Sequence, residues 1–196
     1  MQYYIYSLVC FLLPGTVWLI WNKGMIADKA YKVRHIIWIY IYLFYGYLAV
    51  QEAAGIGTIW DLIAYGKLDN SINLIPISSE GAMTYILNII MFMPFGFLLP
   101  LIWKNFRNAK KVVLMGFLMS LAIEICQLFN MRTTDIDDLL MNTLGTLVGY
   151  CCWKVFSLIF RNAGTKCVEM KKSEPVIYMF GGILGLFLLY NWRVFD

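Results

Sequence analysis

Residues 83–103 read MTYILNIIMFMPFGFLLPLIW, and this stretch contains no charged side chain. A helix needs about 20 mostly apolar residues to span a bilayer, so the stretch is predicted to cross a membrane. Five other runs have a similar character, at 3–21, 33–51, 112–130, 139–160 and 176–192. We therefore predict an all-α protein, a polytopic transmembrane helix bundle of about six spans.

The composition of the whole chain supports the same class. Of its 196 residues, 61% are hydrophobic and 14% are charged, and the mean hydropathy is +0.67. Soluble domains contain about 45–50% apolar and about 25% charged residues. We expect one membrane domain over 1–196, a multi-pass protein of the cell membrane surrounded by lipids. The net charge of +4 lies in short loops between apolar runs, which excludes a nucleic-acid partner.

The basic residues alternate from loop to loop. Thirteen of the sixteen lysines and arginines fall between 23 and 34, between 104 and 111, and between 154 and 172. The other three are Lys67, Arg132 and Arg193. Loops rich in lysine and arginine stay in the cytoplasm. The pattern predicts that both termini lie outside the cell.

Several polar side chains interrupt the apolar runs at a similar depth. Asn88, Glu124 and Asn142 lie about 6–9 Å inside the outer ends of their predicted helices, at 1.5 Å per residue. Polar groups inside a membrane are costly and by default mark a functional site. We predict that they converge below the outer loop that follows residue 130. The predicted binding cluster consists of Asn88, Glu124, Gln127, Arg132, Asp135, Asp138 and Asn142.

A purely structural reading of this cluster stays open. Glu124 would then pair with Arg132, and the aspartates would occupy the first turn of the next helix, with Thr133 or Thr134 as its N-cap. Asn and Gln side chains also join helices in membranes. We expect neither a metal nor a cofactor, since the aspartate spacing does not match a calcium-binding loop.

Other segments are predicted to have structural roles. His35 sits beside a predicted cytoplasmic helix end and is interpreted as an interface anchor. Gly145 and Gly149 are spaced for a close helix contact. Between the second and third spans, 60–65 is expected to form a short surface helix, and 72–77 an interfacial or re-entrant segment.

Four blocks of sequence resemble the VanZ family of bacterial membrane proteins. They are INLIPI at 72–77, NIIMFMPFGFLLP at 88–100, SLAIEICQ at 120–127 and RTTDIDDLLMNTLGTLVGY at 132–150. The resemblance therefore covers a core of about 72–150. It implies an origin in Gram-positive bacteria and an association with low-level resistance to teicoplanin, a glycopeptide antibiotic that binds cell-wall precursors. By the same match, the family's characteristic polar positions are the seven residues of the predicted cluster.

Three functions are compatible with these observations. The preferred hypothesis is a non-enzymatic protein that binds a lipoglycopeptide or a lipid-linked cell-wall precursor at the outer leaflet, and so changes access of the antibiotic. A membrane enzyme that uses Glu124 or Asp138 as a general base is the second. A flippase is the third; a chain of this size without an internal repeat would need to form a homo-oligomer for that activity.

Overall fold

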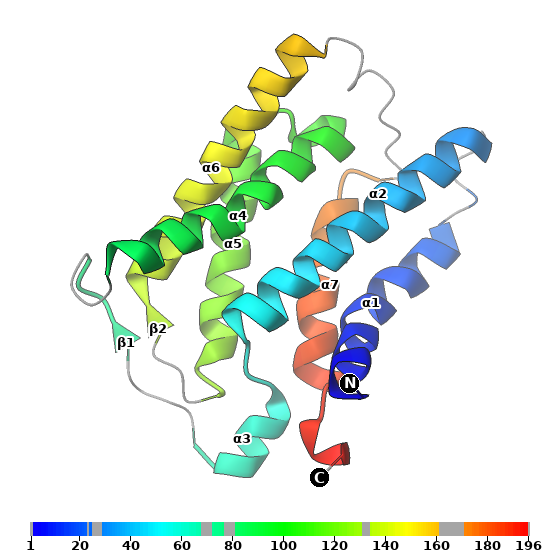
Figure 1. Cartoon of the computed structure of the whole chain (residues 1–196). Helices are drawn as coiled ribbons and strands as arrows, with labels where there is room; N and C mark the ends of the chain where they lie inside the picture. The colour runs from blue at the N-terminus through cyan, green and yellow to red at the C-terminus, as the bar shows by residue number, and fades with distance from the viewer. Residues whose placement is uncertain are drawn as a thin grey trace.

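The computed structural model describes residues 2–22, 24, 29–67, 72–76, 81–130, 134–160 and 171–195. Helices dominate this part of the chain (Figure 1). The α-helices are α1 (Gln2–Asn22), α2 (Lys29–Tyr47), α3 (Ile59–Tyr65), α4 (Ala82–Ile102), α5 (Ala109–Gln127), α6 (Ile136–Ile159) and α7 (Glu174–Leu189). The shorter elements are the π-helix η2 (Leu48–Ala54), the 3₁₀ helices η3 (Lys104–Phe106) and η4 (Trp192–Phe195), and the strands β1 (Ile72–Asn73) and β2 (Thr134–Asp135).

A helix occupies each of the six segments predicted to span the membrane, so the all-α class is confirmed. Within the described residues, three helical stretches are long and apolar enough to cross a bilayer: Gln2–Asn22, Lys32–Gln51 and Ala82–Ile102. α7 is apolar but has only 16 residues. α5 carries Lys110, Lys111 and Glu124 within its 19 residues. The structure thus contains three candidate spans, and the count of six crossings stays a prediction.

α1 runs antiparallel to α2 and to α7, and hydrogen bonds between the helix ends show this. Near the start of α1, Ser7 Oγ lies 2.8 Å from the hydroxyl of Tyr47 at the end of α2. The Tyr6 hydroxyl donates to the carbonyl of Leu189 at the end of α7, at 2.6 Å. Both chain ends therefore lie at the same end of the bundle as α3 (Figure 1).

Glycines bring α4 and α6 into backbone contact. A Cβ atom on Gly145 would overlap the carbonyl of Ile89, and one on Gly149 would overlap the carbonyl of Met93. From the other side, Gly96 of α4 lies against the backbone of Thr146. The predicted close helix contact at 145 and 149 is confirmed. It holds α6 directly against α4, which brings the polar residues of these two helices together.

Aromatic rings join α4 to the helices on its other side. Tyr42 of α2 is fully buried; its ring stacks on Phe95 at 5.8 Å between centroids and meets Trp103 edge-on at 4.9 Å. Trp103 also packs against Tyr178 of α7. Aromatic pairs of this kind contribute about 0.5–1.5 kcal/mol beyond the area they bury. These rings therefore join the second half of α4 and the residue that follows it to α2 and to the first turns of α7.

His35 is not an interface anchor, contrary to the sequence-based interpretation. The residue is only 5% exposed, and its Nε2 lies 2.8 Å from Oε1 of Glu174, which is fully buried. The Tyr178 hydroxyl donates to the same oxygen at 3.3 Å. A buried polar group needs a hydrogen-bond partner, and these two residues, 139 positions apart in the chain, provide one for each other.

The long connection between α2 and α4 folds back onto the bundle. Its predicted short helix is confirmed as α3, which begins with a capping box between Thr58 and Asp61. Trp192 Nε1 donates to Asp61 Oδ1 at 2.8 Å, and Trp60 Nε1 donates to the Leu188 carbonyl at 3.1 Å. Within the segment predicted to be interfacial or re-entrant, 72–73 forms a strand parallel to β2. Its position relative to the membrane stays a prediction. Residue 77 lies outside the described residues.

Candidate functional site: a buried polar cavity

A cavity of about 180 Å³ lies between α4, α5, α6 and the end of η2. Five residues of the predicted cluster line it: Asn88, Glu124, Gln127, Asp138 and Asn142. The remaining lining residues are Ala53, Ala54, Thr84, Met91 and Ile123. Asp135 lies beside the cavity and does not line it, and Arg132 lies outside the described residues. The structure therefore brings most of the predicted polar residues together, and their role in binding stays a prediction.

Helix periodicity explains why each helix contributes a pair of polar residues. Residues three or four apart lie on the same face of an α-helix. The pairs are Thr84 and Asn88 on α4, Glu124 and Gln127 on α5, and Asp138 and Asn142 on α6. Because the glycines hold α6 against α4, these three faces meet around one space.

Glu124 is held where α5 meets the strand β2. Its side chain is 3% exposed, and Oε2 accepts a hydrogen bond from the backbone N–H of Asp135 at 3.2 Å. The Thr134 hydroxyl donates to the backbone carbonyl of Glu124 at 3.2 Å. These contacts orient the carboxylate between the cavity and the start of α6.

Asp135 is the N-cap of α6, and the predicted Thr134 cap is wrong. The carboxylate of Asp135 accepts from the backbone N–H of Asp137 at 2.9 Å, as an N-cap side chain does. Asn73 Nδ2 donates to its other oxygen at 2.9 Å. Thr134 cannot cap the helix because it is part of β2 and its hydroxyl is bonded to Glu124. The other predicted cap, Thr133, lies outside the described residues.

Two aspartates in the first turn of α6 are bonded to α4. Asn88 Nδ2 donates to Asp138 Oδ1. The Tyr85 hydroxyl donates to Asp137 Oδ2 at 2.7 Å, and Asp137 is fully buried. The predicted cluster included neither Tyr85 nor Asp137. One signal was available, since Tyr85 precedes Asn88 by three residues and so lies on the same side of its helix.

The cavity presents two carbonyl oxygens that have no hydrogen-bond partner among the described residues: Gln127 Oε1 and Asn142 Oδ1. These side chains are only 6% and 2% exposed. Gln127 Nε2 donates to the backbone carbonyl of Ala54 at 3.0 Å, and Asn142 Nδ2 donates to Ser120 Oγ at 2.9 Å. A backbone carbonyl can only accept, so Nε2 of Gln127 is the donor in this bond and Oε1 is the atom without a partner.

These unpaired oxygens have a chemical consequence. A buried acceptor without a partner costs about 1–3 kcal/mol. A ligand that donates hydrogen bonds, such as an ammonium group or hydroxyls, would recover this energy and would also suit the carboxylates of Glu124 and Asp138. Within the described residues, no three His, Cys, Asp or Glu side chains are grouped so that they could hold a metal.

Comparison with known proteins identifies the family of the chain. Residues 4–157 match the VanZ/LLP1 family, a longer stretch than the motif-bearing core and one that contains every residue of the predicted cluster. The chain is 34% identical to Protein VanZ of Enterococcus faecium over 134 residues, which are 67% of this chain and 77% of that protein. No solved structure matches the chain. This protein therefore belongs to the VanZ/LLP1 family of membrane proteins.

Proposed function

We propose that this protein lowers the access of glycopeptide antibiotics to cell-wall precursors by binding a membrane-associated ligand at the outer leaflet. The ligand is a lipoglycopeptide or a lipid-linked precursor, and its polar part enters the cavity between α4, α5 and α6. One observation carries the proposal: two buried amide oxygens without partners line the same cavity as two carboxylates. The family resemblance supplies the link to teicoplanin.

The chemistry of the cavity fits such a ligand. The two amide oxygens accept hydrogen bonds, and the carboxylates of Glu124 and Asp138 favour a positively charged donor. Amines and sugar hydroxyls on an antibiotic or a precursor are donors of this kind. The amide orientation of Gln127 is set by its bond to Ala54, so the acceptor is in place before a ligand arrives.

The charge distribution supports an outward-facing cavity. The end of the bundle that carries the termini, α3 and the cavity includes Asp61, Asp135, Asp137 and Asp138. The opposite end carries most of the basic residues in the described ranges: Lys29, Lys32, Arg34, Lys104, Arg107, Lys110, Lys111, Lys154, Lys171 and Lys172. With six crossings, the positive-inside rule places this second end in the cytoplasm and both termini outside.

Antibiotic susceptibility tests the proposal directly. Wild type and the variants Gln127→Leu and Asp138→Asn are expressed at matched membrane levels in a teicoplanin-sensitive Gram-positive host. Wild type is expected to raise the teicoplanin concentration that stops growth, and both variants are expected to lose this protection.

Gln51→Leu is the matched control for these variants. Gln51 also has a buried amide oxygen without a partner among the described residues, but it does not line the cavity. This variant is expected to protect as wild type does. Undiminished protection by both cavity variants, or no protection by wild type, would contradict the proposal.

A further strain that carries Glu124→Gln decides the enzymatic alternative. Glu124 is a buried carboxylate that could act as a base on a lipid or precursor, and its oxygen lies next to the backbone N–H of Asp135. Mass spectrometry of lipids and precursors compares strains with and without the protein. A new or depleted species that depends on Glu124 would favour catalysis over binding.

A further inference from the structure

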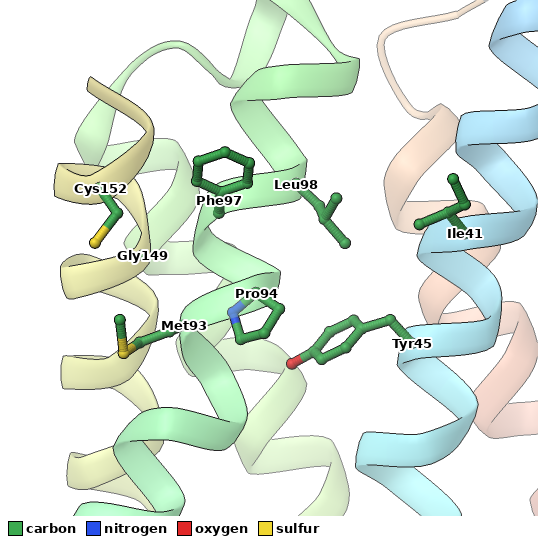
Figure 2. A pocket seen from close by; sticks show the side chains of 8 residues that line it. All are labelled: Ile41, Tyr45, Met93, Pro94, Phe97, Leu98, Gly149 and Cys152. Atoms are coloured by element: carbon green, nitrogen blue, oxygen red, sulfur yellow. The ribbon is translucent and has the colours of Figure 1, made fainter. Parts of the chain in front are cut away.

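An apolar groove of about 470 Å³ lies across α4, between α2 and α6. Its lining residues are Ile41, Tyr45, Met93, Pro94, Phe97, Leu98, Gly149 and Cys152. Figure 2 shows Ile41 and Tyr45 reaching from α2 toward α4, with Cys152 and Gly149 on α6 at the other side. None of these side chains is charged. The volume lies within the range of about 300–1,000 Å³ that is usual for ligand sites.

The groove adjoins the polar cavity along α4. Met91 lines the cavity, whereas Pro94 and Leu98, three and seven residues further on, line the groove. This spacing keeps the three residues on one side of the helix. Tyr45 lies at the junction, and its hydroxyl donates to the carbonyl of Met91 at 2.5 Å. This hydrogen bond therefore lies at the boundary between the polar cavity and the apolar groove.

The distance between the cavity and the groove is close to the length of one lipid acyl chain. From Asn88 in the cavity to Leu98 in the groove, α4 rises about 15 Å, at 1.5 Å per residue. The hydrocarbon core of a bilayer is about 30 Å thick and contains two layers of acyl chains, so this distance is close to the length of one chain. An amphiphile with its head in the cavity would therefore have a chain long enough to reach along the groove.

We infer that the groove between α2, α4 and α6 holds an acyl chain of an outer-leaflet amphiphile whose polar head occupies the cavity lined by Glu124, Gln127 and Asn142. The ligand of this protein is thus recognised at both of its ends. The inference rests on the proposed function for the head, and it adds a separate binding surface for the chain.

Photo-crosslinking tests the chain site. The full chain is placed in vesicles of phosphatidylglycerol and phosphatidylethanolamine that contain a small proportion of phospholipid with a diazirine in its acyl chain. After irradiation, mass spectrometry locates the adducts. A diazirine near the lipid head is expected to label Tyr45 and Met91, and one near the chain end is expected to label Phe97 and Leu98.

Ordinary boundary lipid provides the comparison. Ile86 and Ile90 are 50% and 54% exposed on α4 and line neither hollow. Lipid that merely surrounds the protein would label these residues as strongly as the groove. Equal labelling of both sets, or labelling that does not follow the diazirine position, would overturn the inference.

Two adjacent cysteines give a matched pair of variants. Cys151 and Cys152 are both exposed on α6, but only Cys152 lines the groove. Cys152→Trp fills the groove and is expected to reduce its labelling to the level at Ile90, whereas Cys151→Trp is expected to leave it unchanged. If the two variants label the groove alike, the chain does not occupy it.

Different results would contradict the acyl-chain site in the groove and the proposed function. If groove labelling is specific but Gln127→Leu still protects against teicoplanin, the chain site stands and the proposed function falls. If Gln127→Leu abolishes protection and no specific groove labelling occurs, the cavity acts on a ligand without a bound acyl chain.

Discussion

Replacing Gly149 by alanine tests how closely α4 and α6 must approach. Alanine normally stabilises a helix by about 0.5–1 kcal/mol relative to glycine. At Gly149, the new Cβ would overlap the carbonyl of Met93, a backbone atom that cannot move without its helix. Overpacking of this kind costs about 1–3 kcal/mol. The overlap outweighs the helix propensity, and we expect a net loss of about 1–2 kcal/mol.

Gly181→Ala is the matched control because its expected effect on stability has the opposite sign. A Cβ there would meet only Pro14 Cβ, at an ordinary distance of 3.5 Å. With no clash, the gain in helix propensity of about 0.5–1 kcal/mol should remain. Thermal unfolding of both variants in detergent, followed by tryptophan fluorescence, measures the difference.

The expected shifts in melting temperature follow from the size of the chain. A change of 1 kcal/mol moves the midpoint by about 2–4 °C for chains of about 150–250 residues. Gly149→Ala should therefore melt about 2–8 °C below wild type, and Gly181→Ala should melt at or above it. A Gly149→Ala protein as stable as wild type would refute the close contact, and with it the geometry that brings the polar faces together.

Three further contacts give predictions for the same unfolding assay or for proteolysis. Tyr85→Phe removes a donor to the buried carboxylate of Asp137 and should cost about 1.5–3 kcal/mol, whereas loss of the exposed Tyr65 hydroxyl should have no effect. His35→Ala leaves Glu174 buried without its imidazole partner and should cost about 3–5 kcal/mol; equal stability would refute the pairing. Trp192→Phe deletes a hydrogen bond to α3 and should speed proteolytic cleavage near that helix, and an unchanged cleavage rate would contradict this docking.

Hydropathy and helix geometry account for the parts that could be predicted from the sequence. The positions of the six long helices follow from the apolar runs, because a bilayer demands helices of a set length. The convergence of Asn88, Glu124 and Asn142 follows from their depth, because the rise per residue is constant. The spacing of Gly145 and Gly149 predicted a close helix contact, and only the structure shows that α4 is the partner.

The sequence did not predict how the helices pack beside one another. Depth along a helix axis can be counted in residues, but the direction in which a side chain points depends on how the helices pack. The pairing of His35 with Glu174 joins residues 139 positions apart, so no local spacing indicates it. For the same reason, the strand pairing that places Asn73 on Asp135 was not predicted.

The sequence by itself thus determined which segments are helical and how far along each helix its polar residues lie, because hydropathy and the helical repeat act along one dimension. The tertiary structure alone decided that Tyr85 binds Asp137, that Gln127 and Asn142 line the cavity with amide oxygens that lack a partner among the described residues, and that an apolar groove lies beside it. These features depend on the rotation and approach of whole helices, which glycine contacts and buried aromatic rings set across segments distant in the chain.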